Sequence, residues 1–377
     1  MSLGDISDIT KLAGFEFTQY VQYEDSGNII ALRGLNCKNG SLDLTDVKYI
    51  DNSILEKLTR SKLYVGDILF TYVGTVGEVA IIEENDRFYL APNVSRIRVE
   101  QGYNPYFIKQ LIHTKRFYNK IIFPLIATSS QPALSMENVR KFSLSIPQES
   151  EQGKLAEFLN ILDQRISTQK KIIEDLKKLK DAITHFHFRN ELTHSPMTYI
   201  GQYITQVSRR NKDTKIDRVL SVSNKYGFVD QDEQFEDRVV ASIDTSNYKV
   251  VQKGDFAYNP ARINVGSVAI LQEFENGIVS HMYVCFTTNK ELLPAYFELY
   301  LSTNIFKHEM YKRLEGSVRL CLTYESLCNI KIALPEFSVQ TDLASKVSAL
   351  LTKIKNEERL LCLYHNFKQY LMTQMFI

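Results

Sequence analysis

A chain of 377 residues, 44% of them hydrophobic, is long enough for two or three domains with substantial cores. Lys and Arg number 45 and Asp and Glu 44, so the net charge does not indicate a polyanion partner, and any nucleic-acid surface must be local. The five cysteines are scattered without disulfide-framework or metal-ligand spacing. No apolar run is long enough to span a membrane, and no signal peptide opens the chain. We therefore expect a cytoplasmic protein with free thiols and no membrane partner.

Residues 1–147 have the pattern of a mixed α/β domain. Runs rich in β-branched and aromatic residues predict strands at 63–73, 76–83 and 88–99. Residues 105–122 begin with a proline and carry apolar residues at helical spacing, which predicts a helix. A Ser/Thr-containing loop at 127–132 then leads to a short helix and a predicted strand at 142–146.

The segment Asn104-Pro105-Tyr106-Phe107 resembles the N-P-P-F/Y motif of adenine methyltransferases, but one proline is missing and no Gly-rich cofactor loop accompanies it. The simpler interpretation is that Asn104 caps a helix that begins at Pro105. The sequence also has no nucleotide-binding P-loop or nucleophile elbow, and its seven histidines are not at metal-ligand spacing. We therefore predict no catalytic residue and no metal site.

Residues 148–192 form a second segment, with a long helix predicted over 151–189. Its apolar residues recur at alternating spacings of four and three, as on the contact face of a helix that packs on another helix. Gln169 and Lys180 interrupt this stripe. The apolar seam positions are Leu155, Leu159, Leu162, Ile166, Ile173, Leu176 and Ile183.

Residues 193–335 form a second α/β domain after a predicted linker at 190–196. Strands are predicted at 250–258, 265–273 and 278–287, followed by a helix at 294–313 and a Gly-containing loop at 315–319. Several of its motifs repeat the first domain. Gly254-Asp255 repeats Gly66-Asp67, and Leu322 repeats Leu134 at the same interval in the chain.

Residues 336–377 repeat the seam of the central helix. Leu343 follows Leu155 at the interval that separates the domain motifs, which we call the repeat interval. Both copies of the seam turn polar at the same two places, here Glu357 and Lys368. The apolar seam positions of this copy are Leu343, Val347, Leu350, Ile354, Leu361, Tyr364 and Leu371.

An interval of about half the chain indicates duplication of a domain together with its helix, because it is too long for a solenoid repeat. The predicted fold is α/β (α+β), with two mixed domains joined by two long antiparallel helices in a pseudo-two-fold coiled coil.

A resemblance to a known family is carried by the start of the central helix. The residues Ile146-Pro147, Glu151-Gln152, Lys154-Leu-Ala-Glu-Phe-Leu159, Leu162-Asp163 and Arg165-Ile166 are similar to the conserved region of type I restriction-modification specificity (S) subunits. The ending Tyr370 to Phe376 and the order of domain, helix, domain, helix resemble the same family. The second helix keeps Pro335, Gln340 and Ala344 but has Leu351 where the first copy has Asp163.

This resemblance implies a non-catalytic DNA-binding subunit. Each half would be a target-recognition domain that reads one part of a bipartite site on double-stranded DNA. The paired helices would set the spacing between the two parts and would bind two methyltransferase (M) subunits, and the complex would recruit the restriction (R) subunits. S-adenosylmethionine, ATP and Mg²⁺ would be bound by those partners, and no cofactor is expected in this chain.

The residues that contact DNA have to be chosen by their chemistry, because the resemblance implies that the recognition domains vary. Arg, Asn and Gln on exposed Gly-containing turns favour base contacts, whereas other basic side chains favour phosphate contacts. In the first domain the candidates are Arg33, Asn36, Lys38, Tyr72, Thr75, Ser129, Ser130 and Gln131. In the second domain they are Asn259, Arg262, Asn264, Ser317 and Arg319, with Arg209, Arg210, Lys212 and Lys225 as phosphate contacts.

Two alternatives remain open from the sequence. The near-neutral domains also suit a coiled-coil scaffold that joins two protein-binding domains without nucleic acid. A fused restriction enzyme or methyltransferase is disfavoured by the missing cofactor and nuclease motifs.

Overall fold

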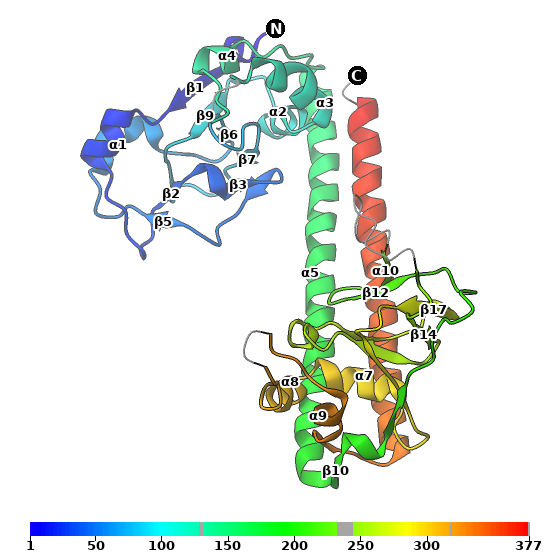
Figure 1. Ribbon diagram of the computed structural model, residues 1–377. Coiled ribbons are helices and arrows are strands. Elements are labelled where there is room, and N and C mark those ends of the chain that lie inside the picture. The colour runs from blue at the N-terminus through cyan, green and yellow to red at the C-terminus, as the bar shows by residue number, and fades with distance from the viewer. Residues whose placement is uncertain (128–130, 232–243, 317–318, 376–377) are drawn as a thin grey trace. The chain divides into compact units, whose positions relative to one another are not determined.

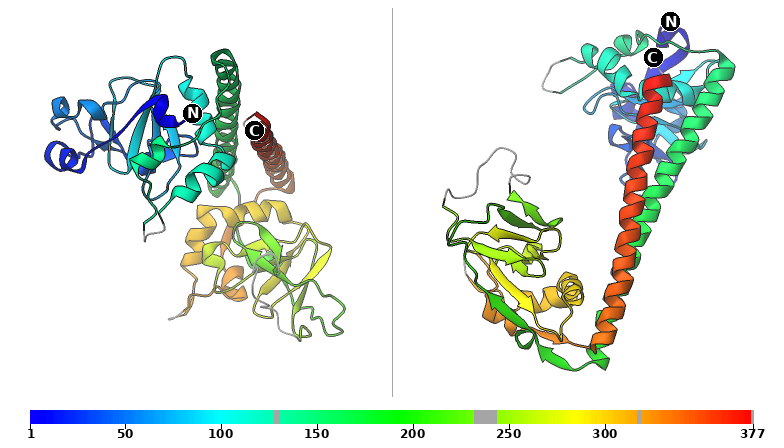
Figure 2. Two further views of the ribbon diagram at one scale, coloured as in Figure 1. Left: turned by 90° about the horizontal axis from the view of Figure 1, so that it is seen from above. Right: turned by 90° about the vertical axis from the view of Figure 1, so that its right-hand side faces the viewer.

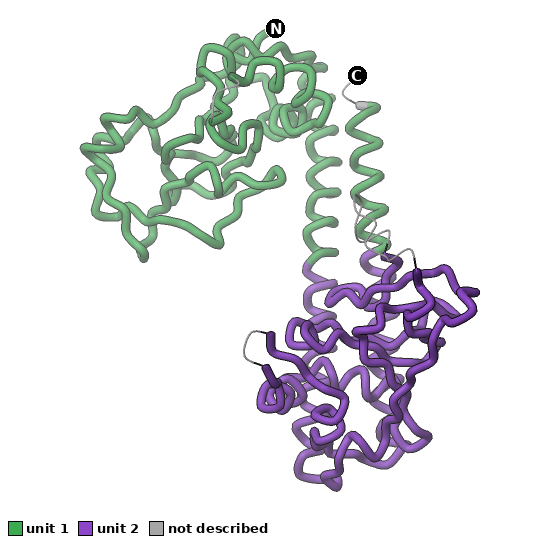
Figure 3. The backbone as a smooth tube through the Cα atoms, in the orientation of Figure 1, with its two compact units in different colours: residues 1–170, 359–377 green, residues 171–358 purple. Residues whose placement is uncertain are grey.

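The computed structural model describes residues 1–127, 131–231, 244–316 and 319–375. The chain divides into two compact units, shown in different colours in Figure 3. The first unit comprises residues 1–170 and 359–377, and the second comprises residues 171–358. Each unit contains a globular α/β part and segments of two long helices.

The long helices are α5 (Glu149–His194) and α10 (Phe337–Met375), which lie side by side in Figures 1 and 2. In the first unit, Asp163 of α5 pairs with Lys368 of α10 at 2.5 Å. In the second unit, Lys177 of α5 pairs with Glu358 of α10 at 2.6 Å. Residue numbers thus rise along α5 as they fall along α10, which confirms the predicted antiparallel packing.

The contact faces of α5 and α10 coincide with the two apolar stripes. Every seam position is buried or partly buried, and the buried ones are Leu159, Leu162, Ile166, Ile173, Leu343, Val347 and Ile354. Helix α5 is longer than the predicted helix at both ends. The predicted linker at 190–196 is wrong in its first five residues, which continue α5 as far as His194. No Gly or Pro lies between Gly153 and Pro196, so nothing local ends the helix earlier.

The two units contain the same four-stranded antiparallel sheet. Its strand order is β1-β9-β6-β7 in the first unit and β11-β18-β15-β16 in the second. The strands of the first sheet are β1 (Ser7–Lys11), β6 (Ile68–Thr71), β7 (Val79–Ile81) and β9 (Val94–Val99). Those of the second are β11 (Ile204–Val207), β15 (Phe256–Tyr258), β16 (Val268–Ile270) and β18 (Val284–Thr288). A shared order of this kind supports the duplication inferred from the sequence.

Smaller sheets complete each unit. The first unit has the three-stranded sheet β5-β2-β8 and the pair β3-β4, formed by β2 (Ile30–Leu32), β3 (Cys37–Lys38), β4 (Ser41–Leu42), β5 (Lys48–Tyr49) and β8 (Phe88–Leu90). The second has the pairs β12-β13, β14-β17 and β10-β19, formed by β10 (Met197–Tyr199), β12 (Leu220–Ser223), β13 (Gly227–Asp230), β14 (Lys249–Gln252), β17 (Asn276–Val279) and β19 (Lys331–Ala333).

The shorter α-helices lie between the last strand of the main sheet and the next long helix in each unit, apart from α1 near the N-terminus. They are α1 (Gly14–Tyr20), α2 (Pro105–Ile112), α3 (Lys115–Phe117), α4 (Met136–Arg140), α7 (Pro294–Ser302), α8 (Asn304–Tyr311) and α9 (Tyr324–Cys328). Asn104 caps α2, because its side-chain oxygen accepts the backbone N–H groups of Tyr106 and Phe107. This confirms the structural interpretation of the Asn104-Pro105 motif.

Three predicted strands cross from one sheet to another and are therefore broken. The prediction at 88–99 splits into β8 and β9 at Asn93, whose φ of +72° bends the chain. The prediction at 250–258 splits into β14 and β15 around Gly254, whose φ is +93°. The prediction at 278–287 splits into β17 and β18. The predicted strand at 142–146 is wrong: Ser143 forms only an isolated bridge with Ser2.

The helices predicted at 105–122 and 294–313 are each broken at a threonine. Thr114 separates α2 from α3 and accepts the N–H of Phe117 at 3.0 Å, and Thr303 separates α7 from α8 and accepts the N–H of Phe306 at 3.1 Å. These side chains cap a new helix and so redirect the chain.

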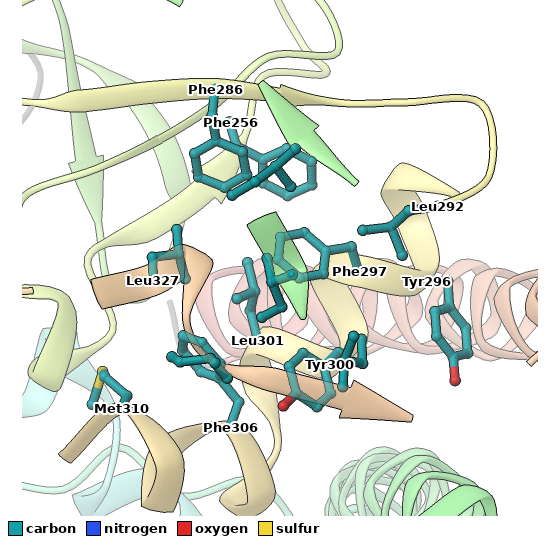
Figure 4. Packing of buried hydrophobic residues seen from close by; sticks show 14 of the residues in the cluster. Phe256, Phe286, Leu292, Tyr296, Phe297, Tyr300, Leu301, Phe306, Met310 and Leu327 are labelled. Carbon is teal, nitrogen blue, oxygen red and sulfur yellow. The ribbon is translucent and has the colours of Figure 1, made fainter. Parts of the chain in front are cut away.

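The core of the second unit lies between its sheet, α7 and the long helices (Figure 4). The rings of Phe256 and Phe286 stack with centroids 5.1 Å apart, and Phe297 of α7 packs edge-on against both. Phe188 of α5 and Leu343 of α10 belong to the same core. The helix pair is therefore part of the hydrophobic core of this unit, which fixes the sheet and its loops on the helices.

Candidate nucleic-acid interface

The first unit brings two of the predicted DNA-contacting loops together. The loop between β6 and β7 contains Tyr72 and Thr75, and the segment before α4 contains Gln131. Gly74 donates its N–H to the carbonyl of Pro132 at 2.9 Å, and Leu134 donates its N–H to the carbonyl of Tyr72 at 2.8 Å. These backbone bonds hold the two loops side by side, so their outward side chains form one surface.

The second unit repeats this junction. The loop between β15 and β16 contains the predicted residues Asn259, Arg262 and Asn264. Leu322, which precedes α9, donates its N–H to the carbonyl of Pro260 at 3.1 Å. Donor and acceptor both follow their counterparts, Leu134 and Tyr72, at the repeat interval. The same backbone contact therefore joins the same two loops in both halves.

A glycine in the left-handed region gives each of these loops its turn into the next strand. Gly77 has φ +98° and its counterpart Gly266 has φ +93°, values that side chains disfavour. A Cβ on Gly77 would lie 2.8 Å from the ring of Tyr118. Both glycines are therefore needed for the loop conformation that orients the polar residues.

Arg33 lies close to Thr75 in the first unit. The two residues line a pocket of about 310 Å³ together with Tyr23 and Asn93. The Arg33 guanidinium is held by Asp46, whose carboxylate and carbonyl accept at 2.7 and 3.0 Å. Arg33 is thus fixed at the edge of a pocket beside the loop junction, with its charge already compensated.

Asn36 has a structural role in this arrangement. It is fully buried, and its amide group donates to the carbonyls of Asp43 and Asp46 at 2.9 and 2.8 Å while its oxygen accepts the N–H of Arg33. The amide is therefore committed to shaping the loop. The neighbouring Lys38 is exposed and lies 3.8 Å from the carboxylate of Asp43.

The second unit has the more open arginines. Arg262 and Arg319 are both exposed, and among the described residues no hydrogen bond or ion pair engages either guanidinium. Asn259 accepts the N–H of Ala261 and so shapes its own turn, and the Asn264 carbonyl accepts the Tyr311 hydroxyl at 3.4 Å. Arg262 and Arg319 thus have side chains available for a ligand.

The four predicted phosphate contacts fall into two groups. Arg209 is paired with the buried Asp255, and Arg210 donates to the carbonyl of Asn247 at 2.7 Å, so both hold local structure. Lys212 and Lys225 are exposed, and the Lys225 ammonium lies 4.8 Å from the centre of the Tyr226 ring. Ser129, Ser130 and Ser317 lie outside the described residues.

Sequence reasoning missed three residues beside the first junction. The Lys11 ammonium lies 5.2 Å from the centre of the half-buried Tyr72 ring, and Tyr23 and Asn93 line the pocket of Arg33. Lys11 and Tyr23 reach the site through contacts far apart in the sequence, so no local pattern identifies them. Asn93 was accessible to sequence reasoning, because a Pro-Asn pair marks a turn.

Within the described ranges, no three His, Cys, Asp or Glu side chains are grouped so as to hold a metal ion. The helices of these ranges also lack any span that is apolar and long enough to cross a membrane. Each unit thus presents two loops that are joined by backbone hydrogen bonds, and their polar side chains form a surface suited to binding.

Comparisons with known proteins agree with this picture. Residues 1–178 match the family described as the type I restriction modification DNA specificity domain. A protein of Methanocaldococcus jannaschii, named as the specificity subunit of the type I restriction enzyme MjaX, is 25% identical over 347 residues. The match covers 85% of this chain and 80% of that protein.

Solved structures resemble the whole chain. The S subunit of a type I restriction-modification system from M. genitalium has a TM-score of 0.62 at 14% identity, covering all of this chain and 95% of that one. A chain from a structure on complex assembly and conformational transition of the type I R-M system has a TM-score of 0.57 at 13% identity, covering all of this chain and 96% of that one. At these identities the structural likeness shows the fold.

Proposed function

Because this chain is similar to the non-catalytic specificity subunits of type I restriction-modification systems, and its residues 1–178 match the model of their DNA specificity domain, we propose that it reads a two-part DNA sequence, one part with each unit. The observation that carries the proposal is the duplicated loop junction. The contacts Leu134–Tyr72 and Leu322–Pro260 place equivalent loops on equivalent sheets. Two equivalent reading surfaces in one chain suit a target of two separate parts.

In the second unit, Arg262 and Arg319 are the residues that we propose for base reading. A guanidinium that no described residue engages can donate two parallel hydrogen bonds to the O6 and N7 atoms of a guanine. In the first unit the corresponding surface is formed by Thr75, Gln131 and the pocket edge at Arg33. Lys212, Lys225 and Lys38 are exposed, and we propose that they contact phosphates, which position a protein on DNA without reading its sequence.

The helix pair would bind the catalytic partners. Large apolar side chains remain exposed on both helices, although the seam itself is covered. They include Phe158, Ile161, Phe186, Leu351, Leu363, Phe367 and Tyr370. Exposed apolar residues in such number are typical of a protein-binding surface. We propose that two methyltransferase subunits dock there and that restriction subunits join the complex, which would act on cytoplasmic DNA.

In this proposal the partner subunits carry out the catalysis. S-adenosylmethionine, ATP and Mg²⁺ would be bound by the methyltransferase and restriction subunits. The chain would contribute sequence choice and geometry.

The proposal is tested by co-expressing the chain with its methyltransferase partner and mapping methylated sites across a genome. The wild-type complex should methylate one two-part sequence with a constant spacer. Arg262→Ala and Arg319→Ala should relax the choice of base in one part of the site and leave the other part unchanged, at a cost of about 1–3 kcal/mol per lost base contact.

The matched control is Lys290→Ala, which removes an exposed cation of the same unit outside the loop junction. It should leave both parts of the recognised sequence unaltered. Equal weakening at every site by the arginine variants would assign them to phosphate contacts, and methylation without a two-part pattern would contradict the proposal.

A further inference from the structure

The first unit contains a pocket that is rich in cations and distinct from the loop junction. It has a volume of about 670 Å³ and lies where α3 meets α5 and α10. Its charged side chains are Lys115, Arg116, Lys170 and Lys368, against the single carboxylate of Asp163. Two imidazoles, those of His113 and His365, also line it.

The one carboxylate is already engaged by the protein. Lys368 donates to one oxygen of Asp163 at 2.5 Å, and the amide of Gln110 donates to the other at 2.7 Å. Asp163 therefore neutralises Lys368, and both of its oxygens already accept a hydrogen bond. Among the described residues, Lys115, Arg116 and Lys170 have no ion pair, and all three are exposed.

At the equivalent positions of the second unit, positive and negative charges are balanced. Lys177 and Glu358 form an ion pair across the helix pair at 2.6 Å. The positions that correspond to them at the repeat interval are His365 and Lys170, so the first unit has two basic groups where the second has a base and an acid. Lys115 and Arg116, at the interval that relates Gly77 to Gly266, correspond to the uncharged pair Asn304-Ile305.

Burial first, and neighbouring positive charge second, lower the pKa of both imidazoles. The pKa of His113 falls to about 4 through burial, followed by the charges of Lys109 and Lys368. The pKa of His365 is also lowered, by burial and then by Lys170 and Lys368. Because Lys115, Arg116 and Lys170 have no ion pair among the described residues, the pocket favours an anion, whose binding would remove the repulsion between its cations.

We propose that this pocket binds phosphate groups, through Arg116, Lys115 and Lys170. A guanidinium matches the geometry of phosphate oxygens with two parallel hydrogen bonds, and ammonium groups add point charges. The pocket is large enough for several linked phosphates, as in a polyphosphate, a nucleotide or a segment of DNA backbone. The site does not depend on which bases the loops read.

Calorimetric titration of the full chain with tripolyphosphate at constant ionic strength tests the site. Wild type should bind with one-site stoichiometry. Lys170→Glu, which installs the acid found at the equivalent position of the second unit, should weaken binding by about tenfold or more, because a charge-assisted contact becomes a repulsion. The matched control Lys171→Glu makes the same charge change on an exposed neighbour that does not line the pocket, and it should change the affinity less than about twofold.

Arg116→Gln serves as a second variant, because it removes a cation without adding an acid. Thermal melting of each variant shows that it is folded. Competition with a short duplex of unrelated sequence identifies the source of the phosphates. Displacement of the duplex by tripolyphosphate assigns the pocket to DNA backbone, and binding of both together assigns it to a free phosphate ligand. Failure of wild type to bind tripolyphosphate, or equal losses in Lys170→Glu and Lys171→Glu, would overturn the proposal.

Discussion

Lys368 of α10 places its ammonium 2.5 Å from the carboxylate of Asp163 on α5, and this contact lies beside a buried lysine. Lys109 of α2 is buried, and its pKa is lowered by that burial while the charge of Asp163 opposes the shift. Asp163 is therefore the counter-charge for two lysines and the acceptor of the Gln110 amide. One carboxylate connects the globular part of the first unit with both long helices.

Stability should depend on pH through Asp163. Burial alone would raise its pKa, but the charge and hydrogen bond of Lys368, the Gln110 amide and the charge of Lys109 together hold it below the usual value of 3.8. Because the folded pKa is lower than the unfolded one, the ionised carboxylate stabilises the fold fully above about pH 5, and this contribution is lost as the pH falls through the folded pKa. Urea unfolding at pH 7 and pH 4 should show that Asp163→Asn costs about 1–3 kcal/mol at pH 7 and less at pH 4. Asp175→Asn, an exposed acid on the same helix, should cost little at either pH.

Two buried glutamines anchor the long helices to their units. Gln152 accepts the N–H of Asn104 at 2.9 Å and donates to the carbonyl of Pro147 at 3.0 Å. Gln340, its counterpart at the repeat interval, accepts the N–H of Leu293 at 2.8 Å and donates to the carbonyl of Pro335 at 3.0 Å. Each glutamine thus joins the start of α5 or α10 to the start of α2 or α7.

Gln152→Ala should destabilise the chain by about 2–3 kcal/mol, because a donor and an acceptor lose their partner. Gln340→Ala should cost a similar amount. The two effects should add in the double variant, since the glutamines share no partner. The measurement is urea unfolding with Gln148→Ala, an exposed neighbour, as control. A cost as small as that of the control would show that water replaces the lost hydrogen bonds.

The cysteines should differ strongly in reactivity. Burial, the largest cause in each case, raises the pKa of Cys37 and of Cys285 to about 12, whereas Cys362 is exposed on α10. At pH 8 a thiol-specific disulfide reagent should therefore modify Cys362 first and reach Cys37 and Cys285 only after unfolding. Cys362→Ser should remove the fastest phase. A fast phase that persists in this variant would assign the reaction to Cys321 or Cys328, which are partly buried.

The long helices and the duplication were predictable because their signal is local and periodic. Leu159 and Val347 are buried at the spacing that the stripes require, and the repeat interval reappears in hydrogen bonds as well as in sequence. Helix breaks were harder to predict. Thr114 and Thr303 lie within continuous apolar patterns, and their capping bonds end a helix that the apolar spacing would continue.

The candidate site was predicted less completely, because exposure depends on contacts that are distant in the sequence. Asn36 resembles a surface residue on a Gly-containing turn, yet its amide satisfies the carbonyls of Asp43 and Asp46 and is buried. Arg209 forms an ion pair with Asp255, which is distant from it in the sequence. Arg262 has no such partner among the described residues and remains exposed. The residue types can be read from the sequence, but whether an arginine is already paired within the fold cannot.

The last prediction concerns helix length. If the helix pair sets the distance between the two parts of the target, lengthening both helices by the same number of whole heptads should lengthen the spacer. One heptad inserted into α5 after Lys170 and one into α10 after Glu358 keep each seam in phase and add about 10 Å, or about 3 base pairs of DNA.

Methylation mapping of this double-insertion variant should therefore show the original two half-sites with a spacer about 3 base pairs longer. The control carries the insertion in α5 alone, which shifts Lys177 out of register with Glu358 and should abolish methylation at both spacings. A double-insertion variant that still methylates the original spacing would refute the role of the helices in setting the distance. The loops proposed to contact bases keep their sequence in every variant. A change in the recognised half-site sequences would therefore argue against separate roles for the loops and the helices.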